Sequence, residues 1–187
     1  AKGCWSLVLA AEEAGGGRLY LGGFQACSEE WLTEHTVTHV VNTARGLETF
    51  FTGWGRRLPA LQDRLGLQIF NCDWDDRSTQ SIWPSERLQE GVIFIGKAML
   101  DQRNILVHCA QGKSRSAALV IAFLVVWYGM TVPNALRFVQ QRRGIAEPNP
   151  GFMQNLAAFE QSDAVAALRQ VLLGSAGPRP MPARPIT

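Results

Sequence analysis

Short apolar runs separated by polar and turn-rich stretches occupy the first two thirds of the chain. Each run is rich in β-branched or large apolar side chains, which is typical of strands buried in a sheet. The runs lie at residues 5–10, 18–21, 38–44, 67–74 and 104–109. The pattern therefore predicts a sheet made largely of buried strands.

Helical patterns fill the stretches between and after these runs. Ser28 is a typical N-cap, and the residues after Ser114 are apolar nearly all round, as in a helix packed on a sheet and covered by others. The predicted helices are SEEWLTEH, 85–100, the stretch from Ser114, 131–143 and 151–173. Residues 45–66, in which arginines stand among aromatic side chains, stay unassigned. Together the elements predict an α/β fold with a central mixed, mostly parallel β-sheet flanked by helices.

The composition indicates one globular domain with a short tail. Of the 187 residues, 47% are apolar and 18% are charged, so we expect a single domain over residues 4–173. The Pro- and Gly-rich residues 174–187 cannot form a core and are expected to be disordered. A net charge of +2 gives no indication of nucleic-acid binding. The longest apolar run, residues 117–130, is shorter than the roughly 20 residues of a membrane span.

The cysteines carry no metal or disulfide pattern. Cys4, Cys27, Cys72 and Cys109 are widely spaced, and none stands in a CxxC pair or in a cluster with histidine that would indicate zinc. A chain of this size does not need disulfides for stability. We expect reduced thiols in the cytoplasm or the nucleus, no secretory leader, and no metal or other cofactor.

The stretch VHCAQGKSRSA, residues 107–117, joins a strand, a short loop and a helix. The loop between Cys109 and Arg115 can turn its backbone N–H groups toward one point, which also faces the positive N-terminus of the helix. Gly112 lets the backbone curl, and the Arg115 guanidinium matches phosphate oxygens in a bidentate fork. The spacing predicts a phosphate-binding loop with backbone donors from Ala110, Gln111, Gly112, Lys113 and Ser114.

Cys109 stands where these positive surroundings act on a thiol. They lower its pKa from about 8.5, and a thiolate beneath a bound phosphoryl group is a nucleophile placed for attack. Ser116 can hydrogen-bond to the sulfur and ease its departure when the intermediate is hydrolysed. The competing interpretation is that Cys109 is a small buried hydrophobic residue at a turn. The register of Cys, Gly, Arg and Ser after an apolar strand favours the catalytic interpretation.

HCAQGKSRSA resembles the HCxxGxxRS signature of the cysteine-dependent protein tyrosine phosphatase superfamily, specifically its dual-specificity branch. RLYLGG followed by THVVNTA looks like the opening strands of that branch. NALRFVQQRRGIAEPNPGF looks like the helix and the Pro-Asn-x-Gly-Phe segment that follow the loop. The resemblance covers residues 18–162 and implies a protein tyrosine phosphatase-like fold in a compact, atypical member.

The resemblance implies a role for each residue that matches the signature. Cys109 would be the nucleophile, and Arg115 would bind the phosphoryl group and its transition state. Ser116 would support departure of the thiolate. His108 would help to tune the thiol, and Asn149 would brace the loops around the site.

A general acid completes the set that the resemblance implies. In this branch an Asp on a mobile loop before the nucleophile protonates the leaving oxygen. Asp73, Asp75 and Asp76 precede Cys109 by 36, 34 and 33 residues. Asp76 is nearest the family spacing, and Ile82 matches the apolar residue that follows the acid. We therefore predict Asp76 as the acid, with Asp75 as the alternative.

The implied function is hydrolysis of phosphotyrosine and of phosphoserine or phosphothreonine in proteins, with two alternatives left open. Lys113 is a residue type that lipid phosphatases of the superfamily carry in this loop, so a phosphoinositide substrate is the first alternative. Gln111 stands where those enzymes usually carry a second basic residue. The second alternative is a catalytically weak module that binds phosphoproteins.

Three further features of the sequence each have two possible interpretations. Arg143, near the Pro-Asn turn, would either contact substrate or lie at a solvated helix end. Cys72 would either be a buried strand residue or reach Cys109 as a resolving thiol on oxidation. Residues 45–66 form a longer stretch than a compact member needs, and would either shape substrate access or be a surface insertion.

Overall fold

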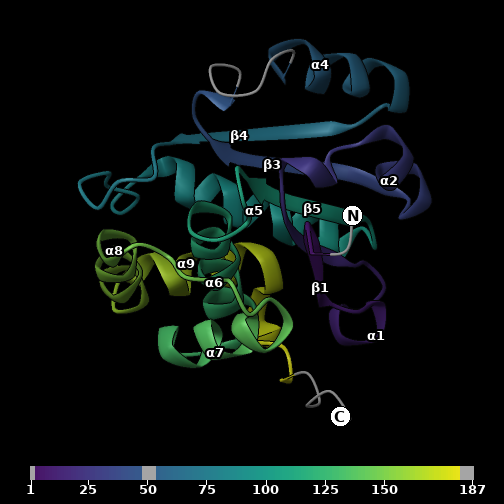
Figure 1. Cartoon of the computed structure of the whole chain (residues 1–187). Helices are drawn as coiled ribbons and strands as arrows, with labels where there is room; N and C mark the ends of the chain where they lie inside the picture. Colours follow the sequence, from purple (N-terminus) through teal and green to yellow (C-terminus); the bar gives the residue numbers. More distant parts are fainter. Residues whose placement is uncertain (1–2, 48–53, 182–187) are drawn as a thin grey trace.

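The computed structural model describes residues 3–47 and 54–181 (Figure 1). Within these ranges five strands form one sheet in the order β1-β2-β5-β3-β4. β1 is antiparallel to β2, and the other neighbours are parallel. The strands are β1 (Trp5–Leu9), β2 (Leu19–Gly23), β3 (Val37–Ala44), β4 (Gln68–Trp74) and β5 (Asn104–Cys109). The predicted strands and the mixed, mostly parallel sheet are confirmed.

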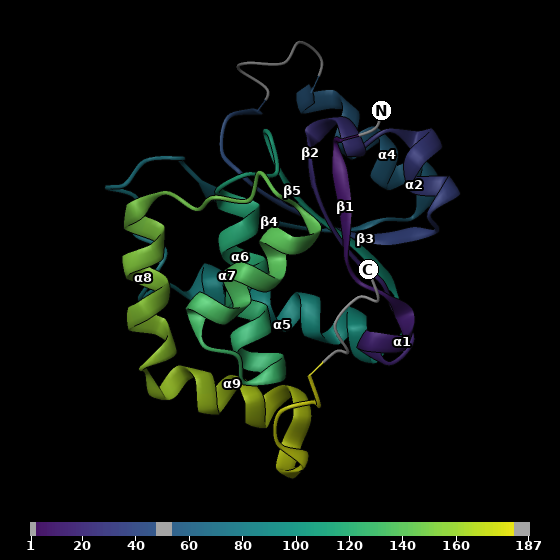
Figure 2. The ribbon, with the colours of Figure 1, turned by 60° about the horizontal axis from the view of Figure 1, so that its bottom comes forward.

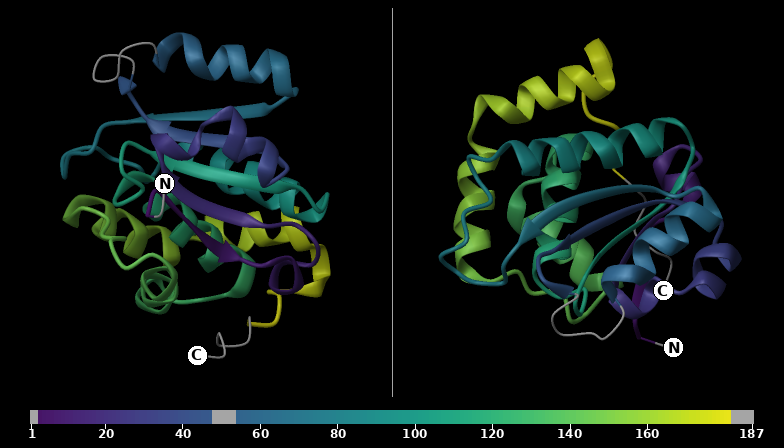
Figure 3. Two further views of the ribbon diagram at one scale, coloured as in Figure 1. Left: turned by 45° about the vertical axis from the view of Figure 1, so that its right-hand side comes forward. Right: turned by 90° about the horizontal axis from the view of Figure 1, so that it is seen from above.

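Helices cover both faces of this sheet (Figures 1 and 3). The short helices α1 and α2 and the longer α4 come from the first half of the chain, and α5 to α9 come from the second. The helices are α1 (Ala11–Ala14), α2 (Glu29–Glu34), α4 (Trp54–Leu65), α5 (Glu86–Leu100), α6 (Arg115–Tyr128), α7 (Val132–Arg142), α8 (Pro150–Glu160) and α9 (Asp163–Leu173). Two 3-10 turns, η1 (Phe24–Ala26) and η2 (Gly174–Ala176), complete the described elements.

α6 is the central helix of the main core. It is buried from Ser116 to Tyr128 because it packs on the sheet and contacts α5, α7, α8 and α9 (Figure 2). This is the environment predicted from its all-round apolar pattern. No single helix in the described part of the chain is long and apolar enough to cross a membrane, and α6 with α7 reaches that length only as a pair bent by 119°.

The predicted continuous helix over residues 151–173 is wrong, because the chain breaks it into α8 and α9. Ser162 stands at the break and its hydroxyl donates to the Phe159 carbonyl at 2.6 Å. After the break, α9 turns to lie across α5 and α6 (Figure 2), where Leu168 and Leu172 are buried. Burial of these apolar side chains stabilises the break between the two helices, which neither Gly nor Pro marks in the sequence.

The unassigned region contains α4, and residues 48–53 lie outside the described residues. Leu58 and Leu61 of α4 join a second apolar cluster on the far face of the sheet, together with Trp31 of α2 and Cys109. Pro59 stands within the helix and obscures its pattern in the sequence. Through this second cluster, α2 and α4 cover the end of β5.

Part of the tail that was expected to be disordered has a defined place. The backbone N–H of Arg179 donates to the Trp127 carbonyl at 2.8 Å, and its guanidinium lies 5.1 Å from the Trp127 ring. Trp127 is in the last turn of α6, whose carbonyls lack partners within the helix. Residues 174–181 therefore supply a donor that this helix end requires, and residues 182–187 lie outside the described residues.

Candidate active site

The carboxyl ends of the parallel strands β5, β3 and β4 meet at one edge of the sheet. Cys109 is the last residue of β5, and Asp75 and Asp76 follow β4 directly. The N-terminus of α6 begins at Arg115, six residues after Cys109. Ligands of α/β proteins bind at this edge, so the topology alone gathers the predicted residues where a site is expected.

Each backbone carbonyl oxygen of loop residues 110–114 accepts a hydrogen bond from a donor elsewhere in the chain. The donors are Phe24 N–H to Ala110, the Arg143 guanidinium to Gln111 and Gly112, Glu147 N–H to Lys113, and Ala118 N–H to Ser114. In a planar trans peptide the C=O and the following N–H point in opposite directions. The N–H groups of residues 111–115 are therefore turned away from these partners, toward the side of Cys109. The predicted donors Gln111, Gly112, Lys113 and Ser114 are among them, whereas these contacts do not place the predicted Ala110 N–H.

Arg143 holds two of these carbonyls in place. Its Nε donates to the Gly112 carbonyl at 2.7 Å, and its Nη2 donates to the Gln111 carbonyl at 2.7 Å. The residue is 4% exposed. Both earlier interpretations of Arg143 are therefore wrong, because a buried guanidinium turned toward the back of the loop neither contacts substrate nor lies in solvent. Arg143 is a positioning residue.

Gly112 is the one loop position that a side chain cannot occupy. Its φ is 69°, in the left-handed region, and a Cβ there would lie 2.5 Å from the carbonyl oxygen of Gly22. The loop can therefore curl against β2 only with glycine at this point. The same curl brings the Gly112 N–H to 3.1 Å from the Cys109 sulfur.

The Cys109 thiol is 1% exposed and lies at the base of the loop. The Ser116 hydroxyl donates to its sulfur at 3.2 Å. Burial alone would raise the pKa of this thiol, but hydrogen bonds from the Ser116 side chain and backbone, the charge of Arg115 and the Lys113 N–H outweigh burial and lower the pKa. The site therefore favours the thiolate.

Replacing Ser116 tests this origin of the thiolate. In wild type, iodoacetamide should alkylate Cys109 with a pH midpoint below that of the same cysteine in the urea-unfolded chain. Ser116→Ala should move the midpoint upward, because the thiolate loses a charge-assisted donor. Mass spectrometry of the Cys109 peptide measures the rate at each pH. Ser28→Ala, which removes a hydroxyl from the N-cap of α2, is the matched control, and an unchanged midpoint in Ser116→Ala would contradict the assignment.

Arg115 lies between the loop and the segment that follows β4. Its Nη1 donates to the Trp74 carbonyl at 3.3 Å, and its Nε lies 3.6 Å from Oδ2 of Asp76. The side chain is 11% exposed, so its charge acts in a largely dry environment. Arg115 therefore stands where it can face both a bound oxyanion and Asp76.

Asp76 is tied to the loop, whereas Asp75 is not. Oδ1 of Asp76 accepts from the Ser114 hydroxyl at 2.6 Å and from the Asn149 side-chain amide at 3.0 Å. Asp75 instead pairs with Arg45 at 3.5 Å, on an exposed surface. Of the two candidates, the structure brings only Asp76 to the cradle.

Asn149 connects three parts of the site. Its side-chain oxygen caps α8 by accepting from Phe152 N–H at 3.0 Å, its amide reaches Asp76, and its backbone N–H donates to the Ser114 hydroxyl at 3.1 Å. This geometry agrees with the bracing role expected of Asn149. Ser114 thereby gains a second task, because its hydroxyl joins Asn149 to Asp76.

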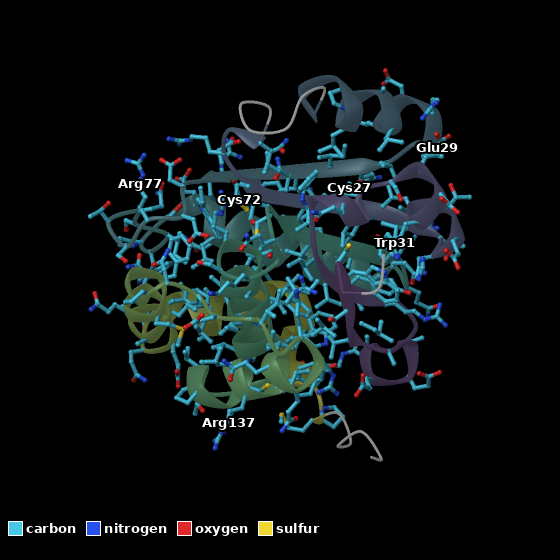
Figure 4. All side chains as sticks on the ribbon, viewed as in Figure 1. Cys27, Glu29, Trp31, Cys72, Arg77 and Arg137 are labelled. Atoms are coloured by element: carbon cyan, nitrogen blue, oxygen red, sulfur yellow. The ribbon has the colours of Figure 1, made fainter. Side chains whose placement is uncertain are left out.

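Two residues that sequence reasoning missed hold the segment carrying Asp76. Oδ1 of Asn155 accepts from the backbone N–H groups of Ile82 and Trp83, each at 2.8 Å. At Gly151 a Cβ would lie 2.0 Å from the Ser78 carbonyl oxygen, so the glycine lets this segment rest on α8. Arg77, next to Asp76, points outward from the segment and is exposed (Figure 4). The Pro-Asn-x-Gly-Phe segment marks Gly151 in the sequence but does not predict its contact with Ser78, and nothing in the sequence indicates the role of Asn155.

His108 is fully buried behind the nucleophile. Its carbonyl accepts from the Thr43 hydroxyl at 2.9 Å, and its Nδ1 lies 3.3 Å from the Cys109 carbonyl oxygen. Burial lowers its pKa to about 4, so the ring is neutral at physiological pH. His108 therefore lies next to the nucleophile as an uncharged ring.

Cys72 does not lie where it could act as the resolving thiol of Cys109. β3 separates β4 from β5, which places the two cysteines two strand spacings, about 9.5 Å, apart, beyond the span of a disulfide. Cys72 also belongs to the main core and lies beneath β4 (Figure 4), whereas Cys109 belongs to the second cluster. Burial raises the pKa of Cys72, which makes its thiol unreactive. The interpretation as a buried strand residue holds.

Residues 19–162 match the family model of the dual specificity phosphatase catalytic domain. The chain belongs to the dual specificity phosphatase family. The family inferred from the HCxxGxxRS signature is thereby confirmed. No group of three or more His, Cys, Asp or Glu in residues 3–47 and 54–181 is placed to hold a metal ion.

Similarity to individual members of the family extends over most of the chain. The human protein phosphatase Slingshot homolog 3 is 36% identical over 143 residues, which are 76% of this chain and 20% of that protein. The dual specificity protein phosphatase 1 of Arabidopsis thaliana is 34% identical over 146 residues, 77% of this chain and 66% of that protein. The chain thus spans about a fifth of the length of the Slingshot relative.

The fold also matches solved structures of this family. A crystal structure of a mouse putative dual specificity phosphatase, complexed with zinc tungstate, superposes with a TM-score of 0.71. The two share 27% identity, and the match covers 90% of this chain and 93% of that one. The predicted protein tyrosine phosphatase-like fold is confirmed.

Proposed function

We propose that the chain hydrolyses phosphotyrosine and phosphoserine or phosphothreonine in proteins through a cysteinyl-phosphate. The observation that carries this proposal is the Cys109 sulfur beneath the converging N–H groups of its loop, with Ser116 donating to it at 3.2 Å. Its lowered pKa supplies a nucleophile, and the loop with Arg115 supplies donors for three phosphoryl oxygens.

In the first step the Cys109 thiolate attacks phosphorus and the bond between phosphorus and the ester oxygen breaks. The leaving oxygen takes a proton from Asp76, which becomes a carboxylate. Because Oδ1 of Asp76 already accepts two hydrogen bonds, we assign this proton to Oδ2. Arg115 and the loop N–H groups stabilise the charge on the equatorial oxygens throughout.

In the second step water attacks the phosphoryl group and the bond between sulfur and phosphorus breaks. Asp76 accepts the proton that water loses, and inorganic phosphate leaves. The Ser116 hydroxyl stabilises the departing thiolate by its hydrogen bond to the sulfur. Each residue ends in its starting state, so the cycle needs no further reactant.

A kinetic panel at one pH tests this function. Substrates are peptides carrying phosphotyrosine or phosphothreonine, a phosphoinositide, and an RNA 5′-phosphate. We expect turnover of both peptides to exceed that of the other two substrates, and excess chelator to leave all rates unchanged. Faster turnover of the phosphoinositide than of either peptide, or loss of activity with chelator, would contradict the proposal.

A reducing compartment suits this chemistry. A thiolate nucleophile oxidises readily, and the cytoplasm and nucleus keep thiols reduced. We therefore also propose a cytoplasmic or nuclear location, which microscopy of the tagged full-length protein would test.

A further inference from the structure

A cleft of about 490 Å³ opens beside the phosphate-binding loop. Its charged lining consists of Asp76, Lys113 and Glu147, and Pro148 and Met153 are among its apolar lining. Because Asp76 and Lys113 also belong to the candidate active site, the cleft borders the place where the phosphate of a peptide would enter the loop. The cleft therefore meets whatever stands next to the phosphorylated residue.

Lys113 and Glu147 are joined at two points in this cleft. The Lys113 ammonium lies 2.7 Å from Oε2 of Glu147, and the Glu147 backbone N–H donates to the Lys113 carbonyl at 2.8 Å. The backbone bond fixes Glu147 beside the loop, so the ion pair does not depend on the side chains alone. The hydrogen bond and the charge of Glu147 raise the pKa of Lys113, which stays a cation paired with a neighbour.

This pairing removes the positive charge that a second phosphate would need. Lys113 and Glu147 cancel, and Asp76 adds either a negative charge or, when it holds its proton, none. The Glu147 side chain is 71% exposed, so its carboxylate faces whatever enters the cleft. An anionic group beside the scissile phosphate finds no unpaired cation among these lining residues and meets an exposed carboxylate.

We propose that Glu147 is a specificity-determining residue, which directs the site toward phosphorylated residues without a second phosphate beside them. This inference rests on the proposed function and deepens it. It also gives a physical reason to expect phosphoprotein rather than phosphoinositide substrates, since the Lys113 amine that would meet an extra phosphate is already paired with Glu147.

The test compares one phosphotyrosine peptide with the same peptide carrying phosphothreonine at the next position. The quantity measured is kcat/KM at the phosphotyrosine for the doubly phosphorylated peptide divided by that for the singly phosphorylated peptide. Wild type should give a ratio below one. Glu147→Gln keeps the shape of the side chain and frees the Lys113 charge, so it should raise the ratio about fivefold. High salt should suppress the gain.

Two variants isolate the pair. Glu90→Gln removes the same charge from an exposed ion pair with Arg87 on α5, and should leave the ratio unchanged. Lys113→Met combined with Glu147→Gln removes both charges and should abolish the rise in the kcat/KM ratio seen with Glu147→Gln alone. A wild-type ratio above one, or an unchanged ratio in Glu147→Gln, would overturn this inference while leaving the phosphatase function standing. Absence of turnover of both peptides by wild type would overturn the function itself and the inference with it.

Discussion

Cys109→Ser should lower kcat for a phosphotyrosine peptide to less than about a thousandth of the wild-type value. A serine hydroxyl in the same place is not ionised at neutral pH, so no nucleophile remains to form the intermediate. The loop N–H groups and Arg115 are untouched, because Arg143 and the backbone partners hold the loop and the Trp74 carbonyl and Asp76 hold the Arg115 guanidinium. Phosphate should therefore still bind to the variant about as tightly as to wild type.

The comparison that makes this result specific is Cys4→Ser, which changes a partly exposed cysteine outside the loop. It should retain wild-type turnover. Calorimetric titration with inorganic phosphate measures the binding side of the prediction. Retention of a tenth of the wild-type kcat in Cys109→Ser would contradict a covalent mechanism.

The second large effect is expected at Asp76. Asp76→Ala should slow hydrolysis of the phosphotyrosine peptide by about 10²-fold or more at pH 6, because the leaving oxygen departs without a proton. An activated aryl phosphate should be slowed much less, since its leaving group is stable as an anion. Steady-state kinetics on the two substrates gives the ratio that distinguishes loss of the acid from general damage.

Asp75→Ala supplies the matched control. Asp75 follows the same strand but pairs with Arg45 on the exposed surface, so both substrates should keep nearly their wild-type rates. If Asp75→Ala showed the selective loss and Asp76→Ala did not, the assignment of the acid would be wrong by one residue.

The fold was predictable wherever burial left a local pattern. β3 and β5 are apolar runs because they lie inside a sheet covered on both faces, and α6 is apolar all round for the same reason. α4 was hidden by Pro59, and the break between α8 and α9 was hidden because tertiary packing, rather than a turn residue, decides it. A local pattern cannot report a contact that only the finished fold creates.

The residues of the candidate site differ in the same way, since some act within one local segment and others through long-range contacts. Cys109, Gly112, Arg115 and Ser116 act within one loop and helix turn, so their spacing carries the information. Arg143 reaches the loop from the end of α7 across 31 residues of chain, and its buried position depends on where that helix packs. The role of Asn155 is harder still to predict from the sequence. Nothing in the sequence indicates that its side-chain amide accepts hydrogen bonds from the backbone of Ile82 and Trp83.

The central claim is that phosphate is transferred to the sulfur of Cys109 before it reaches water. Rapid mixing of wild-type protein with an aryl phosphate, followed by denaturation within milliseconds and mass spectrometry of the peptides, measures that transfer directly. We predict one phosphate on the Cys109 peptide that forms faster than steady-state turnover, and a larger trapped fraction in Ser116→Ala, because the thiolate leaves less readily. Turnover without a trapped phosphate at any mixing time in both proteins, or a phosphate on a residue other than Cys109, would contradict the account.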